Sequence, residues 1–370
     1  MTDDPNATRY TLHDVPLVDI IVPLWHSAPY LEALFAGLAG LDYPRERMTV
    51  HFVDNGPGDG SLDEAKRQIG RVQGNLPHIE IHEPGKNLGF SGGNNLAIRK
   101  SIEAGHEYSY CLNADASFEP GALREAVAVA EADQGIGAVQ SLLVLQQAPD
   151  EVNSAGNAIH FLGFGYCADY HLKRADLADR VKNIAYASGA GVLLRNAALK
   201  TVGLFDETLF AYHEDLDLGW RMMIAGYRNA LAPRSVVRHR YDFSRSISKW
   251  YFMERNRLLV VLKNYRVPTI IILAPSLVAL DIIMFGFALL GGWWKEKIRA
   301  DAWLFRPSTW TYLIRGRREV AKTRRVPDRE ILRMFTPIIA YQEFESPAVR
   351  LVANPLMRLC FALVKLIVRW

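Results

Sequence analysis

The chain has 370 residues, 49% of them hydrophobic and 22% charged, and its three cysteines lie far apart; this composition excludes a disordered chain and a disulfide framework. The net charge of +3 is unevenly distributed, because residues 1–262 carry 25 basic and 32 acidic side chains, whereas residues 263–370 carry 18 basic and 8 acidic. Since the basic part is interleaved with long apolar runs, this pattern favours an anionic membrane surface as a partner and argues against nucleic acid.

Strands and helices are predicted to alternate along the first third of the chain. Short apolar runs rich in β-branched residues predict strands, and apolar residues spaced three and four apart predict helices. The predicted strands cover residues 17–23, 49–53, 79–82 and 108–112, and the predicted helices cover residues 30–41, 63–72, 94–104 and 120–132. This order predicts an α/β fold with an open, mostly parallel sheet flanked by helices, whose ligands bind at the carboxyl ends of the strands.

The alternation becomes irregular after residue 137 and resumes with a strand at 190–194 and a helix that starts near Glu214. We expect a catalytic domain at residues 1–245. A basic, apolar helical region is expected at 246–370.

The first polar cluster follows two of the predicted strands, VDIIVPLW (18–25) and VDNGPGDGS (53–61). Asp54 could accept a hydrogen bond from the imide N–H of uracil or thymine at a nucleotide site of this kind. The alternative is that Asp54-Asn55-Gly56 forms only a turn, because Asn-Gly is a strong turn signal.

The second cluster is GKNLGFSGGNN (85–95). Its Gly92-Gly93 pair lets the backbone come close to a ligand where a helix begins and exposes N–H groups that can bind phosphate. The cluster matches neither a GxGxxG fingerprint nor a P-loop.

The third cluster is LNADAS (112–117), directly after a predicted strand. The oxygen atoms of Asn113 and Asp115 suit Mg²⁺ or Mn²⁺, which bind diphosphate together with the protein. The alternative is that this cluster caps the next helix. We expect Ser117, which lies nearer to Pro120, to supply the cap and leave Asp115 free.

The fourth cluster gathers Glu214, Asp215 and Asp217 at the predicted start of a helix. Capping and the helix dipole alone favour acidic residues there, but three carboxylates in four positions exceed what capping requires. Like charges raise one another's pKa, which would suit one of them to take a proton from a sugar hydroxyl. His239 follows a β-branched run. A lone histidine is more often structural, and His239 becomes a candidate metal ligand only because the other polar clusters occur in the same chain.

Taken in order, VPLW, VDNG, NLGFSGGNN, LNADAS, GAGVLLRNAALKTVGLFDETLF and HEDLDLGWR resemble the inverting glycosyltransferase family 2, over roughly residues 16–265. The segments ERNRLLVVLKNY (254–265) and RRVPDREILRMF (324–335) are similar to the tail of its bacterial rhamnosyltransferase-like branch. The resemblance implies a GT-A nucleotide-binding fold. One departure is that the family's frequent Asp-x-Asp metal motif is here Asn113-Ala114-Asp115, so a second ligand such as His239 must come from elsewhere.

The resemblance also implies a role for each matching residue. Asp215 is the catalytic base of a direct displacement with inversion, and Asp115 binds Mg²⁺ or Mn²⁺, with His239 as the further ligand. The remaining site residues are donor-binding or acceptor-side. The donor-binding set is Pro23, Trp25, Asp54, Asn87, Gly92, Gly93, Asn94 and Asn113, and the acceptor-side set is Glu214, Asp217 and Arg221.

The apolar stretch Val267–Trp294 has 28 residues, more than the roughly 20 that cross a bilayer. Asp281 near its middle, Pro275 as a break, and basic residues on both sides argue against a simple span; these basic residues are Lys263, Arg266, Lys295, Lys297 and Arg299.

We expect a kinked, re-entrant or in-plane segment, with Ala348–Trp370 as a second interfacial helix. The alternatives are buried helices or a homodimer contact. Because the N-terminus lacks a signal peptide, we expect a monotopic or peripheral protein at the cytoplasmic face of a bacterial inner membrane.

The predicted function is transfer of a sugar, with rhamnose as first choice, from a nucleotide diphosphate to a lipid-linked saccharide acceptor. The predicted donor is dTDP-rhamnose, and a UDP-sugar is the alternative. A non-catalytic, membrane-bound sugar-nucleotide binder is the competing interpretation. A nicotinamide-dependent oxidoreductase is disfavoured because VPLWHSAP (22–29) lacks a glycine fingerprint.

Overall fold

The computed structural model describes residues 15–72, 74–241, 247–338 and 349–370. The strands are β1 (Val18–Leu24), β2 (Met48–Asp54), β3 (His78–His82), β4 (Tyr108–Leu112), β5 (Ala116–Phe118), β6 (Ile136–Leu145), β7 (Ala148–Ser154), β8 (Asn157–Ile159), β9 (Gly165–Cys167), β10 (Lys182–Ile184), β11 (Gly191–Arg195) and β12 (Arg228–His239). The helices are α1 (Leu31–Ala39), α2 (Ser61–Arg71), α3 (Gly89–Glu103), α4 (Ala122–Glu131), α5 (Asn196–Val202), α6 (Glu214–Ile224), α7 (Ile247–Asn264), α8 (Val267–Leu290), α9 (Trp294–Asp301), α10 (Pro307–Thr323), α11 (Asp328–Ile331) and α12 (Asn354–Ile367).

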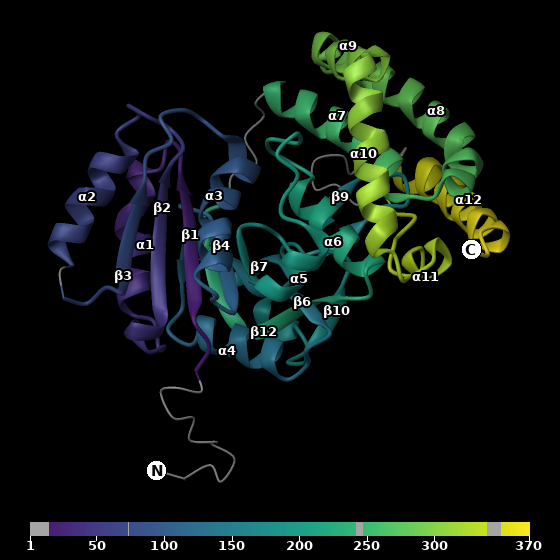
Figure 1. Cartoon of the computed structure of the whole chain (residues 1–370). Helices are drawn as coiled ribbons and strands as arrows, with labels where there is room; N and C mark the ends of the chain where they lie inside the picture. Colours follow the sequence, from purple (N-terminus) through teal and green to yellow (C-terminus); the bar gives the residue numbers. More distant parts are fainter. Residues whose placement is uncertain (1–14, 73, 242–246, 339–348) are drawn as a thin grey trace.

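The central sheet has the strand order β10-β12-β6-β11-β4-β1-β2-β3, so β3 lies at one edge (Figure 1). Neighbours β4, β1, β2 and β3 are parallel, as are β6 and β12, while β11 runs antiparallel between β4 and β6. The predicted open, mostly parallel α/β sheet flanked by helices is confirmed. Its parallel strands end along one edge, as such a sheet requires for a ligand site.

Helices cover both faces of the sheet because the strand side chains alternate between two apolar clusters. One cluster joins β1 and β2 to α1 and α4 and includes the stacked rings of Phe35 and Phe52. The other joins the opposite face to α3, α5 and α6 and includes Ile21, Val53 and Met222. This three-layer arrangement fixes α3 and α6 on the same side of the sheet.

The helices after α6 form a group on the side of the molecule opposite β3 (Figure 1). They share a third apolar cluster with β8 and α6, in which the Trp220 ring packs edge-on against Tyr265 and Phe335. The predicted domain boundary at residue 245 lies outside the described residues. The packing of Trp220 shows that α7 and the segment around Phe335 complete the environment of α6.

Three local expectations are wrong. Helix α3 begins at Gly89, five residues before the expected start, because Gly92 and Gly93 pack inside its first turns. Ser117 caps no helix; it lies in β5 and pairs with β12. Pro275 does not break α8, which is continuous from Val267 to Leu290.

Candidate active site

Asp54 is the last residue of β2 and pairs with Leu24 at the end of β1. Its side chain is buried, and its Oδ1 atom has no hydrogen-bond partner among the described residues. Burial raises the pKa of Asp54, against a backbone hydrogen bond from Gly56 that lowers it. A buried acceptor without a donor is costly and matches a ligand N–H group.

Asn55 holds the second cluster against the strand ends, a role that the sequence did not predict, because Asn55 entered only the alternative in which Asp54-Asn55-Gly56 forms a turn. Its Oδ1 accepts a hydrogen bond from the Leu88 N–H (2.8 Å), and its Nδ2 donates to the Gly89 carbonyl (2.9 Å). Gly93 packs directly on this amide: a Cβ there would lie 3.3 Å from Asn55 Nδ2 and 3.4 Å from Pro23 Cβ. A side chain at 93 would therefore push α3 away from the strand ends.

The other donor-side candidates differ in what they contact. Asn87 accepts a hydrogen bond from the Gly89 N–H (2.8 Å), so it shapes the turn before α3. Asn94 is buried and donates to the Phe90 carbonyl within the helix. A Cβ on Gly92 would lie 2.8 Å from Leu88 Cβ, so Gly92 keeps the turn compact. Trp25 follows the last residue of β1 and is 59% exposed to solvent, so its aromatic ring is available to a ligand.

The metal-site candidates Asp115 and His239 come from distant parts of the chain, and the antiparallel pairing of β5 with the end of β12 brings them together. The imidazole Nδ1–H of His239 donates to Asn153 Oδ1 (2.9 Å), which leaves a lone pair on Nε2. That nitrogen lies 3.4 Å from Asp115 Oδ1 and 3.5 Å from Asn113 Nδ2. In the tautomer with the proton on Nδ1, His239 Nε2 and Asp115 Oδ1 are both electron-pair donors, and such a pair can coordinate a divalent cation.

The candidate base Asp215 lies at the start of α6 and is partly buried. Its Oδ2 accepts from the Gly189 N–H (3.2 Å) and its Oδ1 from the Leu216 N–H (2.7 Å). Burial raises the pKa of Asp215 to about 6, despite these hydrogen bonds, which lower it. A carboxylate that titrates near neutral pH suits a general base.

Two short links connect this base to the rest of the site. The residue after Gly189, Ala190, accepts a hydrogen bond from the Asn113 N–H (3.2 Å) at the metal-site loop. Gly189 also packs against the Phe90 ring of α3, because a Cβ there would lie 2.5 Å from Phe90 Cζ. The loop before β11 thus joins the candidate donor side, the candidate metal ligands and the candidate base.

The loop between residues 209 and 213, which precedes α6, has an unusual backbone. Phe210, Tyr212 and His213 have φ angles of 65°, 66° and 68°, a left-handed conformation that non-glycine residues rarely adopt. The Phe210 carbonyl accepts a hydrogen bond from the Ser91 N–H (3.2 Å) in α3. The loop therefore ties the donor side to the start of α6.

Asn256 of α7 holds this strained loop, and sequence analysis did not identify it. Its Nδ2 lies within 2.9 Å of the carbonyl oxygens of Leu209, Ala211 and Tyr212. The neighbouring Arg255 donates to the Leu209 carbonyl (2.9 Å). The only sequence signal is the RN pair inside ERNRLLVVLKNY, which stands among other polar residues and is therefore not distinctive.

The acceptor-side assignments of Asp217 and Arg221 do not fit the structure. Asp217 is completely buried and pairs with Arg221 (2.8 Å) and Lys263 (2.9 Å). Arg221 is buried and donates to the carbonyls of Val202 and Leu204. Both residues join α6 to its neighbours, because helical spacing alone could not tell the buried face of α6 from its ligand face.

Glu214 differs from both. It is 6% exposed and its Oε2 has no partner among the described residues. Burial, together with the charge of Asp215, raises the pKa of Glu214 well above its usual value. Because Glu214 is next to Asp215 in the chain, its acceptor-side role stays a prediction.

Comparison with known proteins identifies the family and the fold. The curated N-acetylglucosaminyl-diphospho-decaprenol L-rhamnosyltransferase of Mycobacterium tuberculosis is 26% identical over 246 residues, 60% of this chain and 76% of the relative. The solved structure of GalNAc-T7 with UDP, GalNAc and Mn²⁺ superimposes with a TM-score of 0.52 at 12% identity, over 68% of this chain and 48% of the other.

A mannosyltransferase from Pyrobaculum calidifontis, solved with GDP-Man and Mn²⁺, covers 96% of this chain and 88% of its own, with 17% identity and a TM-score of 0.49. Residues 16–259, about two thirds of the chain, match the family described as glycosyltransferase like family 2. The chain therefore belongs to glycosyltransferase family 2, with the GT-A arrangement of sheet and helices.

Proposed function

We propose that this glycosyltransferase transfers a sugar, with L-rhamnose as first choice, from a nucleotide diphosphate to a lipid-linked saccharide with inversion. The observation that carries the proposal is the partly buried Asp215 carboxylate, which is linked through Gly189 and Ala190 to the loop that bears Asn113 and Asp115. The rhamnosyltransferase relative, whose name includes a diphospho-decaprenol acceptor, supports the choice of sugar and of acceptor.

On the donor side, the unpartnered Asp54 Oδ1 accepts a hydrogen bond from the base N–H, and the exposed Trp25 ring offers a surface for stacking. Asn55 keeps the first turn of α3 against these groups. The imide N–H is common to thymine and uracil, so dTDP-rhamnose and a UDP-sugar both fit this contact.

Asp115 and His239 would hold Mg²⁺ or Mn²⁺. When bound, such an ion supplies positive charge that offsets the charge of the leaving diphosphate. Asp215 takes the proton of the acceptor hydroxyl as that oxygen attacks the anomeric carbon, and the strained loop held by Asn256 fixes the start of the helix that carries this base.

The acceptor's lipid suggests a role for the exposed apolar side chains of the tail. One face of α12 is apolar and exposed, through Leu356, Leu359, Leu363, Leu366 and Ile367. Among the described helices, α8 is long and apolar enough to cross a membrane by length and composition, and only 11% of its most apolar window is buried. These two helices contact each other and form the face that we assign to the membrane surface.

An in-plane position of α8 is supported by Asp281, which pairs with the buried Lys297 of α9, while Lys297 also pairs with Glu254 of α7. This network holds α8 along the helices that carry the site. Lys263 and Lys297, two of the basic residues that flank the apolar stretch, are buried in ion pairs and are not exposed for contact with lipid headgroups. Arg350 and Arg369 are exposed at the tail and remain available for that contact.

The test combines donor binding with transfer. A panel of dTDP- and UDP-sugars is screened by thermal shift with Mg²⁺ or Mn²⁺, and the stabilising donor is then incubated with a polyprenyl diphosphate saccharide. We expect dTDP-rhamnose to stabilise the protein and a rhamnosylated lipid product to form. Donor binding without any transfer or donor hydrolysis would contradict the proposal and favour the non-catalytic binder.

A further inference from the structure

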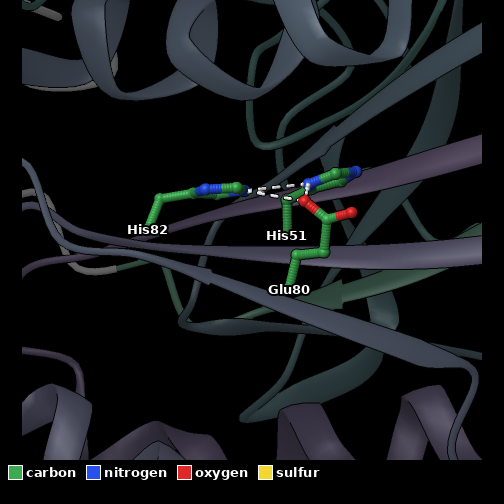
Figure 2. Close-up of side chains that lie close together, drawn as sticks. All are labelled: His51, Glu80 and His82. Carbon is green, nitrogen blue, oxygen red and sulfur yellow. Dashed lines mark hydrogen bonds and ion pairs between the residues drawn. The ribbon is translucent and has the colours of Figure 1, made fainter. Parts of the chain in front are cut away.

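A second cluster of metal-ligating side chains lies away from Asp115 and His239, on the edge half of the sheet. His51 from β2 and Glu80 and His82 from β3 point toward one another, as Figure 2 shows. Glu80 pairs in register with His51, and His82 follows two residues later on the same face of β3. The parallel pairing of β2 with β3 therefore creates the cluster.

The three ligand atoms converge on one point. His51 Nδ1 lies 3.0 Å from His82 Nε2, and Glu80 Oε2 lies 3.6 Å from the first nitrogen and 3.7 Å from the second. Ligands about 2.0–2.1 Å from a tetrahedral zinc ion lie about 3.3–3.4 Å from one another. The observed separations bracket this value, so small side-chain rotations would place all three around one ion.

Asp19 prepares His51 for this role. Its Oδ1 accepts a hydrogen bond from His51 Nε2 (3.0 Å), and its Oδ2 accepts from His106 Nδ1 (2.6 Å). Because the Nε2 proton is held by this buried carboxylate, the lone pair of a neutral His51 ring is on Nδ1, the atom that faces Glu80 and His82. A carboxylate behind a ligating imidazole is the usual support of a zinc site.

The simpler alternative is a hydrogen bond from His82 to His51. That bond accounts for the two rings but not for the carboxylate oxygen, which lies nearly equidistant from both nitrogens and within hydrogen-bond distance of neither. The cluster is also accessible, because the Glu80 side chain is 41% exposed and β3 is the edge strand. Solvent can therefore fill a fourth position.

We propose that His51, Glu80 and His82 bind a first-row transition metal ion, with Zn²⁺ as the preferred one, at a site separate from the site at Asp115. Two imidazoles and one carboxylate suit Zn²⁺ rather than the oxygen-preferring Mg²⁺. The ion would join edge strand β3 to β2 and, through Asp19, to β1. Its role is to stabilise the strands that end at the donor side, and it does not depend on the proposed transfer reaction.

The experiment is a Co²⁺ titration of the full-length, tag-free protein after chelator treatment, in an Asp115→Ala background so that the other site does not contribute. We expect one equivalent to bind with the visible absorption of four-coordinate Co²⁺, to be displaced by Zn²⁺, and Zn²⁺ to raise the melting temperature. His82→Ala and Glu80→Gln should each lower the affinity at least tenfold.

His171→Ala is the control, because the His171 side chain is 56% exposed and pairs with Glu151 rather than with a residue of the cluster. It should bind Co²⁺ like the parent. The melting temperature of each metal-free variant checks its folding, and the conservative Glu80→Gln decides the outcome if His82→Ala does not fold. The absence of saturable binding in the parent, or equal binding by the parent and folded Glu80→Gln, would overturn the proposal.

Discussion

Asp215→Asn tests whether the proposed base is a carboxyl with a raised pKa. In the folded protein the carboxyl titrates at about 6, compared with 3.8 for an ordinary aspartate. Between these two pH values the folded state binds more protons than the unfolded state, so the stability of the wild type falls as the pH rises. Asparagine does not titrate. The variant should therefore gain stability relative to the wild type from pH 4 to pH 6, and the difference should stay constant above pH 6.

The size of this effect follows from the shift. At about 1.36 kcal/mol per pKa unit, the change from 3.8 to about 6 has a ceiling of about 3 kcal/mol. Because the carboxyl is partly exposed, solvent screening lowers the expected value to about 1–3 kcal/mol. Asparagine also loses one of the two acceptors that serve the Gly189 and Leu216 N–H groups, but this cost is the same at every pH.

The assay is urea unfolding of wild type and variant at several pH values, together with transfer kinetics. Asp63→Asn, which makes the same change at an exposed aspartate in the first turn of α2, is the matched control. Transfer by Asp215→Asn should fall by a factor of about 10²–10⁴. A stability difference that does not change with pH would refute the raised pKa, and near-normal transfer by the folded variant would refute the assignment of the base.

Three further predictions concern other parts of the site. Asp115→Ala should weaken donor binding, measured by calorimetry, when Mg²⁺ or Mn²⁺ is present but not in its absence. Chelation should abolish transfer by the wild type, and activity that survives chelation would contradict the metal site. Asn256→Ala should remove the side-chain donor shared by three loop carbonyls, of which the Leu209 carbonyl keeps Arg255. We expect it to lower the free energy of unfolding by about 1–3 kcal/mol and to reduce transfer while donor affinity is kept; unchanged turnover would show that the loop needs no support. The double variant Leu359→Glu, Leu363→Glu should lower the fraction of protein that floats with anionic vesicles, whereas the control Val181→Glu, at a similarly exposed position, should not. Equal binding by the double variant and the control would exclude α12 as the membrane face.

Local sequence patterns determined much of this protein. Strand and helix periodicity predicted β1 to β4 and α6, because burial on one face leaves its period in the chain. The polar residues at strand ends predicted a nucleotide site at one edge of the sheet, since parallel strands end there, and this location stays a prediction. The sequence also predicted that Asp115 needs a distant ligand.

Only the tertiary structure decided which polar residues meet. The pairing of β5 with β12 brings His239 to Asp115. Helix α7 supplies Asn256 to the loop before α6 and Lys263 to Asp217 of α6, both far away in the chain. Asp217, by contrast, turns inward to Lys263. A sequence fixes the spacing of neighbours along a strand or helix, but strand register and helix rotation depend on packing between segments far apart in the chain, so side-chain partnerships across elements have no local signal.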